Sequence, residues 1–331
     1  MIKIKKLINN MPQGDQVKNG KAFEYALANA YAVFVGDNGK NVSFVENDAF
    51  RQAMAYYNEF SDDEKAKFDV AANQTIDTMV RIEPGILAQK NDDDILRIML
   101  NSDSEGEDGD VRDVIMSRTK PSWEIGFSAK NNNDAVKHSR LSNVLDFGKK
   151  WVGIECSDTY WKEINPIFAY LKQAKAENKQ WEELGDDKIE KVYKPLLAAF
   201  RKELLRINSS CPDIPSLLVQ YLIGRYPFYK IIKDDSHNLV IVKAFNINGE
   251  LNKTVNGVKS QYPTPCINLP TRIVEFEMRR GSDNTLNMIL DEGWEISFRI
   301  HNASKKVETS LKFDIKLLGN PPVLFTQHLF R

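Results

Sequence analysis

The chain has 331 residues, of which 42% are hydrophobic and 27% charged, and its formal net charge is −1. This composition excludes a wholly disordered chain, and the charge lacks the strong basic excess typical of nucleic-acid binders. A DNA cleft needs only a local positive field, so the charge does not exclude DNA as a partner. The three cysteines are far apart, which argues against a disulfide framework or a structural zinc site. With no signal peptide and no apolar run near the roughly 20 residues of a membrane span, we expect a cytoplasmic protein without membrane partners.

Apolar spacing predicts the elements in chain order. Helical periodicity predicts helices over 20–34, 48–60 and 61–80, the last with Ser61 and Glu64 as a capping pair. Residues 111–118 and 123–130 are predicted strands, and the turn at 119–122 makes them an antiparallel hairpin. A helix is expected to begin near Asp134 and to carry the residues up to Arg140. Two long helices are expected within 160–206. The C-terminal third is expected to be mainly strand, at 238–245, 272–278, 295–300 and 310–317.

The predicted hairpin carries residues suited to metal-assisted hydrolysis. Asp113 lies on its first strand and Lys130 at the end of its second. A carboxylate can hold Mg²⁺, which prefers oxygen ligands and can lower the pKa of a bound water. The lysine can orient or help deprotonate that water and place positive charge beside a reacting phosphate. The alternative is an ordinary cross-strand surface pair.

This arrangement resembles the PD-(D/E)xK nuclease fold, in which an acid lies two residues before the lysine. Here that position is Ser128, a Ser-x-Lys variant, so one metal ligand must come from elsewhere. Glu124 lies six residues from Lys130, roughly 20 Å along a strand, too far to share one metal site. By analogy with Ser-x-Lys enzymes, Asp146 is one candidate. Glu24 is preferred, because Gly20-Lys-Ala-Phe-Glu24 resembles the start of the first helix of such nucleases, and this glutamate lies beside the apolar stripe.

Longer strings resemble the HaeIII family of type II restriction endonucleases. They are Gly-Lys-Ala-Phe-Glu-Tyr-Ala at 20–26, Asp-Val-Arg-Asp-Val-Ile at 110–115, and the segments 131–142, 294–304 and 307–315. The resemblance covers roughly residues 18 to 320. It implies cleavage of double-stranded DNA by phosphodiester hydrolysis, Mg²⁺ as cofactor and GGCC as the target. It also implies a cognate cytosine methyltransferase as genetic partner, since host DNA needs protection.

The resulting expectation is an α/β (α+β) protein with a restriction-endonuclease-like core, a mixed sheet flanked by helices. We expect a catalytic core at 1–155, a helical region at 156–235 and a strand-rich DNA-recognition region at 236–331. A palindromic target fits either a homodimer or one subunit that nicks each strand in turn. The chain has no P-loop sequence, so no nucleoside triphosphate is expected to be hydrolysed.

Polar residues beyond Lys130 and in the C-terminal third are candidate DNA contacts, because phosphate oxygens and guanine edges accept hydrogen bonds from such donors. The candidates are Lys137, His138, Ser139, Arg140, Arg279, Arg280, Arg299, His301 and Asn302. For Lys137 a solvated face is an equal alternative. Arg299 would instead pair with Asp291, Glu292 or Glu295 if its role were structural.

Two other functions compete with restriction. One is a nuclease of the same fold that acts in repair or on DNA structures. The other is a DNA-binding protein whose catalytic site has decayed, an alternative that rests on Ser128.

Overall fold

The computed structural model describes residues 13–102, 109–132, 135–302 and 304–330. The chain forms two compact units, each assembled from separate stretches: residues 1–134, 225–267 and 323–331 make unit 1, and residues 135–224 and 268–322 make unit 2. The division into 1–155, 156–235 and 236–331 stays a prediction. Within the described ranges no helix has the length and apolar character needed to cross a membrane.

Unit 1 is built on a mixed sheet that contains seven strands within the described residues, in the order β1-β2-β3-β4-β6-β7-β12. Neighbours pair antiparallel, except that β1 runs parallel to β2 and β4 parallel to β6. The strands are β1 (Val42–Val45), β2 (Leu96–Leu100), β3 (Val114–Thr119), β4 (Ser122–Asn131), β6 (Phe228–Asp234), β7 (Leu239–Phe245) and β12 (Thr326–Phe330). Its helices are α2 (Gln13–Asp37), α3 (Asp48–Glu59) and α4 (Asp62–Ile82).

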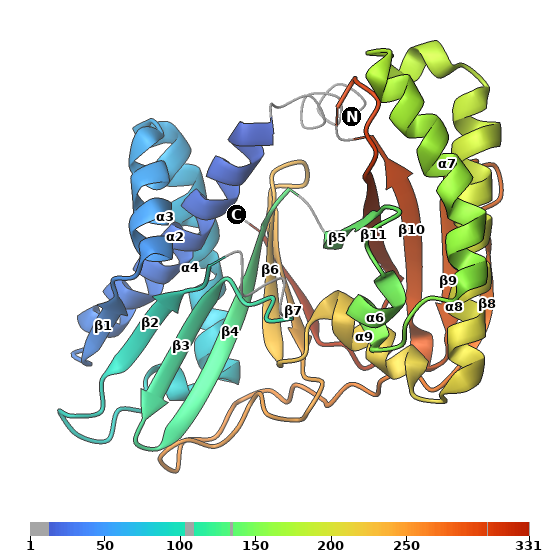
Figure 1. Cartoon of the computed structure of the whole chain (residues 1–331). Coiled ribbons are helices and arrows are strands. Elements are labelled where there is room, and N and C mark those ends of the chain that lie inside the picture. Colours follow the sequence, from blue (N-terminus) through green and yellow to red (C-terminus); the bar gives the residue numbers. More distant parts are fainter. Residues whose placement is uncertain (1–12, 103–108, 133–134, 303, 331) are drawn as a thin grey trace. The chain divides into compact units, whose positions relative to one another are not determined.

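Helices α2 and α4 pack over one face of this sheet (Figure 1). Their apolar stripes share a single core with the inward-facing residues of β4, β6 and β7. The ring of Tyr31 on α2 lies 5.2 Å from that of Phe127 on β4, and its hydroxyl is hydrogen-bonded to Thr75 of α4 at 2.9 Å. This packing fixes α2 against the centre of the sheet, next to the strand that carries Lys130.

Unit 2 combines helices with an antiparallel sheet that has five strands in the described residues, in the order β5-β11-β10-β9-β8. The strands are β5 (Ala135–Leu141), β8 (Ile273–Met278), β9 (Thr285–Leu290), β10 (Glu295–His301) and β11 (Leu311–Gly319). The helices are α6 (Phe147–Val152), α7 (Asp158–Ala176), α8 (Lys194–Ser210) and α9 (Ile214–Ile223). Figure 1 shows α8 beside this sheet, where Phe200 contacts the rings of Phe276, Phe298 and Phe313.

The mixed α/β class, the three N-terminal helices, the hairpin and the two helices within 160–206 are confirmed. The predicted capping pair is present as well, since the side chains and backbones of Ser61 and Glu64 bond reciprocally. Asp113 itself lies one residue before β3, although its N–H still donates to the carbonyl of Phe127 across the hairpin at 2.7 Å.

The helix expected near Asp134 is wrong. Asp134 is outside the described residues, and the segment that follows it is strand β5, so His138 and Arg140 lie on a strand. Its backbone pairs with β11, with Leu141 opposite Leu311 and Arg140 opposite Lys312. Pairing with a strand some 170 residues later overrides local preference, because strand formation depends on the neighbouring strand.

Candidate active site

The hairpin brings Asp113, Ser128 and Lys130 together. One carboxylate oxygen of Asp113, Oδ2, accepts hydrogen bonds from the Ala129 N–H at 2.7 Å and from Ser128 Oγ and Lys130 Nζ at 3.3 Å each. Within the described ranges its other oxygen, Oδ1, has no hydrogen-bond partner. The carboxylate is therefore held firmly through one oxygen and presents the second.

Glu24 reaches the same place from helix α2. Only 6% of the residue is exposed, and its Oε2 accepts from Lys21 Nζ one turn earlier at 3.0 Å. The pKa of Glu24 is raised to about 8, mainly by burial and then by the negative charge of Asp113, whereas the ammonium groups of Lys21 and Lys130 oppose the shift. The charges of Asp113 and Lys130 both act on Glu24, so the helix glutamate lies near the hairpin acid and the lysine.

Asp146, the other candidate acid, accepts hydrogen bonds from backbone N–H groups in unit 2. It is the N-cap of α6, where its carboxylate accepts from the N–H of Lys149 at 2.8 Å and from the N–H of Cys156 at 3.1 Å. These bonds satisfy backbone donors that a helix start would otherwise leave without partners. Its geometry is that of a structural cap.

Arg112, next to Asp113, was not recognised from the sequence. Its guanidinium binds Asp110 through two bonds of 2.8 and 2.7 Å, donates to Glu124 at 2.7 Å and lies 4.5 Å from the centre of the Tyr226 ring. Glu124 is therefore a partner of Arg112 and takes no part in the Asp113 cluster. The i,i+3 spacing of Lys21 and Glu24 was a readable signal, whereas the Arg112 contacts depend on the folded hairpin.

The polar candidates of unit 2 lie on or beside its sheet. Lys137 and His138 are in β5, but their side chains are outside the described part of the chain. Ser139 is buried with its hydroxyl 3.5 Å from that of Tyr221, and Arg140 is exposed and donates to the Ser310 carbonyl.

Further along unit 2, Arg279 and Arg280 are exposed where β8 ends. Arg299 pairs with Asp314 on the adjacent strand at 3.1 Å, a different acid from the three expected partners. Asn302 accepts from the Tyr193 hydroxyl at 2.5 Å, so its side chain is held within unit 2.

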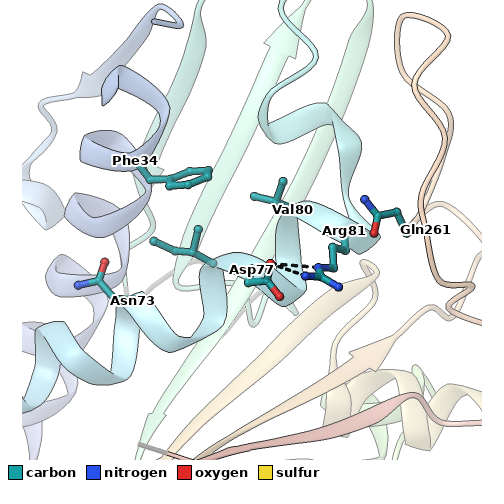
Figure 2. A pocket seen from close by; sticks show the side chains of 7 residues that line it. Phe34, Asn73, Asp77, Val80, Arg81 and Gln261 are labelled. Atoms are coloured by element: carbon teal, nitrogen blue, oxygen red, sulfur yellow. Dashed lines mark hydrogen bonds and ion pairs between the residues drawn. The ribbon is translucent and has the colours of Figure 1, made fainter. Parts of the chain in front are cut away.

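A pocket of unit 1 lies away from this cluster. Figure 2 shows its lining side chains, which come mainly from α4, with the Asp77–Arg81 ion pair at 3.0 Å on one side. The lining residues are Phe34, Asn73, Ile76, Asp77, Val80, Arg81 and Gln261. None of the clustered acids or the lysine lines it.

The donor set at the cluster fits a hard cation. Glu24 and Asp113 supply two carboxylates, with the charge of Asp113 acting on Glu24, and each has an oxygen without a hydrogen bond to any described residue. Divalent cations such as Mg²⁺ take few carboxylates and complete their shell with water and phosphate oxygens. No group of three or more histidine, cysteine, aspartate or glutamate side chains that could hold a metal occurs in the described ranges, so a softer, fully protein-ligated centre is not seen there.

The mixed sheet flanked by helices, with an acid directly before one strand and a lysine on the next, is consistent with the restriction-endonuclease-like fold. The chain belongs to the HaeIII restriction endonuclease family, which matches residues 20–321. It is 38% identical over 307 residues to the type II restriction enzyme HaeIII of Haemophilus aegyptius, covering 92% of this chain and 95% of that protein. No solved structure matches the chain.

Family membership makes this protein a type II restriction endonuclease, which cleaves DNA at specific sites. Enzymes of this class generally use divalent metal ions. Family membership therefore favours a restriction endonuclease over the two alternatives, a repair nuclease and a DNA-binding protein with a decayed site.

Proposed function

We propose that the protein cuts double-stranded DNA at GGCC with Mg²⁺, and that Glu24, Asp113 and Lys130 form its catalytic site. The observation that supports this most directly is the pairing of Asp113 with Lys130, together with the electrostatic effect of both on the buried Glu24 of α2. Similarity to HaeIII over nearly the whole chain supports GGCC as the target.

Asp113 and Glu24 would hold the metal ion. When bound there, Mg²⁺ supplies a lowered pKa for water and positive charge beside the phosphate. Ser128 and the Ala129 N–H orient Asp113, which is the role that remains for a serine at the position of the usual second acid. Lys21 holds Glu24 in place.

Lys130 acts on the nucleophile and on the phosphate. Its side chain is 28% exposed, so the ammonium group, 3.3 Å from Asp113, still reaches solvent and substrate. Hydrogen bonds from Nζ orient the attacking water, and its charge stabilises the negative charge that develops on the phosphate oxygens in the transition state.

The biological setting follows from the activity. An enzyme that cuts GGCC requires a cytosine methyltransferase of the same specificity to protect the host DNA, and it acts in the cytoplasm, where that DNA lies. Because the target is two-fold symmetric, a homodimer would cut both strands in one binding event.

The test is cleavage of a duplex with a single GGCC by the purified protein in Mg²⁺. We expect one cut site in the wild type and at least a ~100-fold slower reaction in Lys130→Met and Asp113→Asn. Lys67→Met, at an exposed position on α4, is the control and should cleave normally. Undiminished cleavage by Lys130→Met would overturn the site, and cuts unrelated to GGCC would overturn the target.

A further inference from the structure

One face of the sheet in unit 2 is polar. The other face is apolar, since Phe276, Phe298 and Phe313 contact Phe200 of α8. Side chains alternate between faces along a strand, and residues opposite each other on antiparallel strands share a face. Residues next to these phenylalanines, such as Arg299 and Asp314, therefore lie on the face turned away from α8.

Basic side chains gather on this polar face across β5, β11 and β10. Arg140, Lys312 and His301 are opposite one another in a single row. Arg299 follows two residues before His301, and Lys316 lies opposite Ser297. Arg140, Arg299, His301 and Lys316 are exposed, and Lys312 is half-buried. Partial burial lowers the pKa of His301, the charges of Arg299, Lys312 and Lys316 lower it further, and Asp314 opposes them.

Two acidic residues of this face lie apart from the basic side chains. Glu275 and Glu277 are on β8, on the far side of the sheet from β5, whereas Glu295 lies at the start of β10. The acid among the basic side chains is Asp314, whose side chain is 9% exposed and binds Arg299 at 3.1 Å. The basic half of the face therefore keeps a positive surface.

Arg299 forms an ion pair with a carboxylate on the adjacent strand, Asp314. Asp314 accepts a hydrogen bond from the guanidinium across the strand pair, while 44% of the Arg299 side chain stays exposed. A planar guanidinium held in one orientation is suited to bidentate binding of guanine O6 and N7, the commonest specific contact in the major groove.

We propose that the polar face of β5, β11 and β10 is the DNA-reading surface, with Lys312 and Lys316 on phosphates and Arg299 on a guanine of the target. The inference rests on the proposed function, which supplies duplex DNA with guanines as the ligand. Charge complementarity identifies the occupant as the DNA backbone, and other proteins also contact DNA through strands of a sheet.

The test measures binding of a GGCC duplex and of a scrambled duplex by fluorescence anisotropy, with the full chain made inactive by Lys130→Met. Lys312→Gln should weaken both duplexes by the same factor and reduce the slope of log affinity against log salt by about one. Arg299→Lys should weaken only the GGCC duplex, by about ten- to a hundredfold. Lys172→Gln, an exposed position on α7, is the control and should change neither.

The outcomes separate this inference from the proposed function. If Lys312→Gln and Arg299→Lys bind both duplexes as the control does, the reading surface is wrong, even while wild-type cleavage at GGCC supports the function. If the wild type cuts nothing at GGCC, the function itself fails. Thermal melting checks folding. Lys316→Gln, at an exposed position, replaces Lys312→Gln if that variant loses its cooperative transition, and it must then weaken both duplexes equally.

Discussion

Two buried glutamates in unit 1 have different environments. Glu83 lies in the core, where Tyr229 Oη, the Asn252 N–H and Trp123 Nε1 all donate to it. Both of its oxygens are used, so its role is structural. Glu24 has one ion-pair partner in Lys21 and faces a second carboxylate, an arrangement that a bound cation would stabilise. Burial alone does not distinguish the two; the neighbours do.

Glu24 and Asp146 are expected to respond in opposite ways to substitution. Glu24→Gln removes a metal ligand and should slow cleavage by about 100-fold or more, because several kcal/mol of charge stabilisation are lost. Asp146→Ala removes a helix cap and should cost about 1 kcal/mol of stability with little change in the cleavage rate. Single-turnover cleavage and thermal melting measure the two effects. The reverse pattern would assign the second acid to Asp146.

Glu83 should make stability depend on pH. Burial raises its pKa from 4.5 to about 7, so the folded state favours the protonated form. The stability it contributes is complete below pH 4.5 and is lost as the pH rises to about 7, by roughly 3 kcal/mol in total. Glu83→Gln cannot ionise, so its free energy of unfolding relative to wild type should improve over that interval. Urea unfolding at pH 5 and pH 7.5 measures this, and a difference independent of pH would contradict it.

The sequence predicted the individual chemical groups better than their partners. Asp113, Ser128 and Lys130 were chosen from residue type and order, and their side chains are hydrogen-bonded to one another. Glu24 was preferred because its segment resembles a nuclease helix start, and the catalytic role of all four residues stays a prediction. The partner of Arg299 was not found, because Asp314 is brought opposite it only by the pairing of β10 with β11. Acids close to Arg299 in sequence did not predict its partner, because cross-strand neighbours depend on the register of the two strands.

At the scale of elements, the β3–β4 hairpin is shaped by the close approach of Arg112 to Gly126. A Cβ atom built on Gly126 would come within 2.2 Å of Arg112 Cδ. Arg112 cannot move aside cheaply, because Asp110 and Glu124 hold its guanidinium. The glycine thus lets Arg112 lie across the hairpin directly before Asp113.

Gly126→Ala should therefore disturb the active site from outside it. We expect a loss of about 1–3 kcal/mol of stability from overpacking and slower cleavage, because the backbone at Asp113 shifts with Arg112. Gly20→Ala in α2 is the matched control: nothing lies within 4 Å of its added Cβ, and alanine favours a helix, so stability should rise slightly. Melting temperatures and cleavage rates are compared. Equal melting temperatures and cleavage rates for the two variants would contradict a role for the close approach of Arg112 to Gly126.

Helices with regular apolar spacing and the tight hairpin were predictable because their signals are local. Strand β5 was not, since its partner β11 lies far along the chain. Strands β1, β2, β6, β9 and β12 were not assigned either, although β9 pairs with its sequence neighbours β8 and β10. The sequence also gives no signal that β6 pairs parallel to β4, a contact that requires the intervening stretch to fold separately.

At the scale of the whole molecule, the proposed roles divide between the units: cleavage in unit 1 and DNA reading in unit 2. Removing divalent ions with EDTA should then abolish cleavage while the phosphate contacts of unit 2 still support DNA binding. Adding Mg²⁺ back should restore cutting. Gel cleavage and anisotropy on the same sample measure both activities. Cleavage that continues in EDTA would contradict the metal requirement.

The parallel pairing of β4 with β6 has a consequence for synthesis on the ribosome. Glu24, Asp113 and Lys130 have all been translated by position 130, yet Asn131 and Lys233, bonded across this pair, are 102 residues apart. Until β6 emerges, the strand that carries Lys130 lacks its second neighbour. A nascent chain thus holds every proposed catalytic group long before it holds them in place, and an enzyme dangerous to unprotected DNA would gain its activity only late in translation.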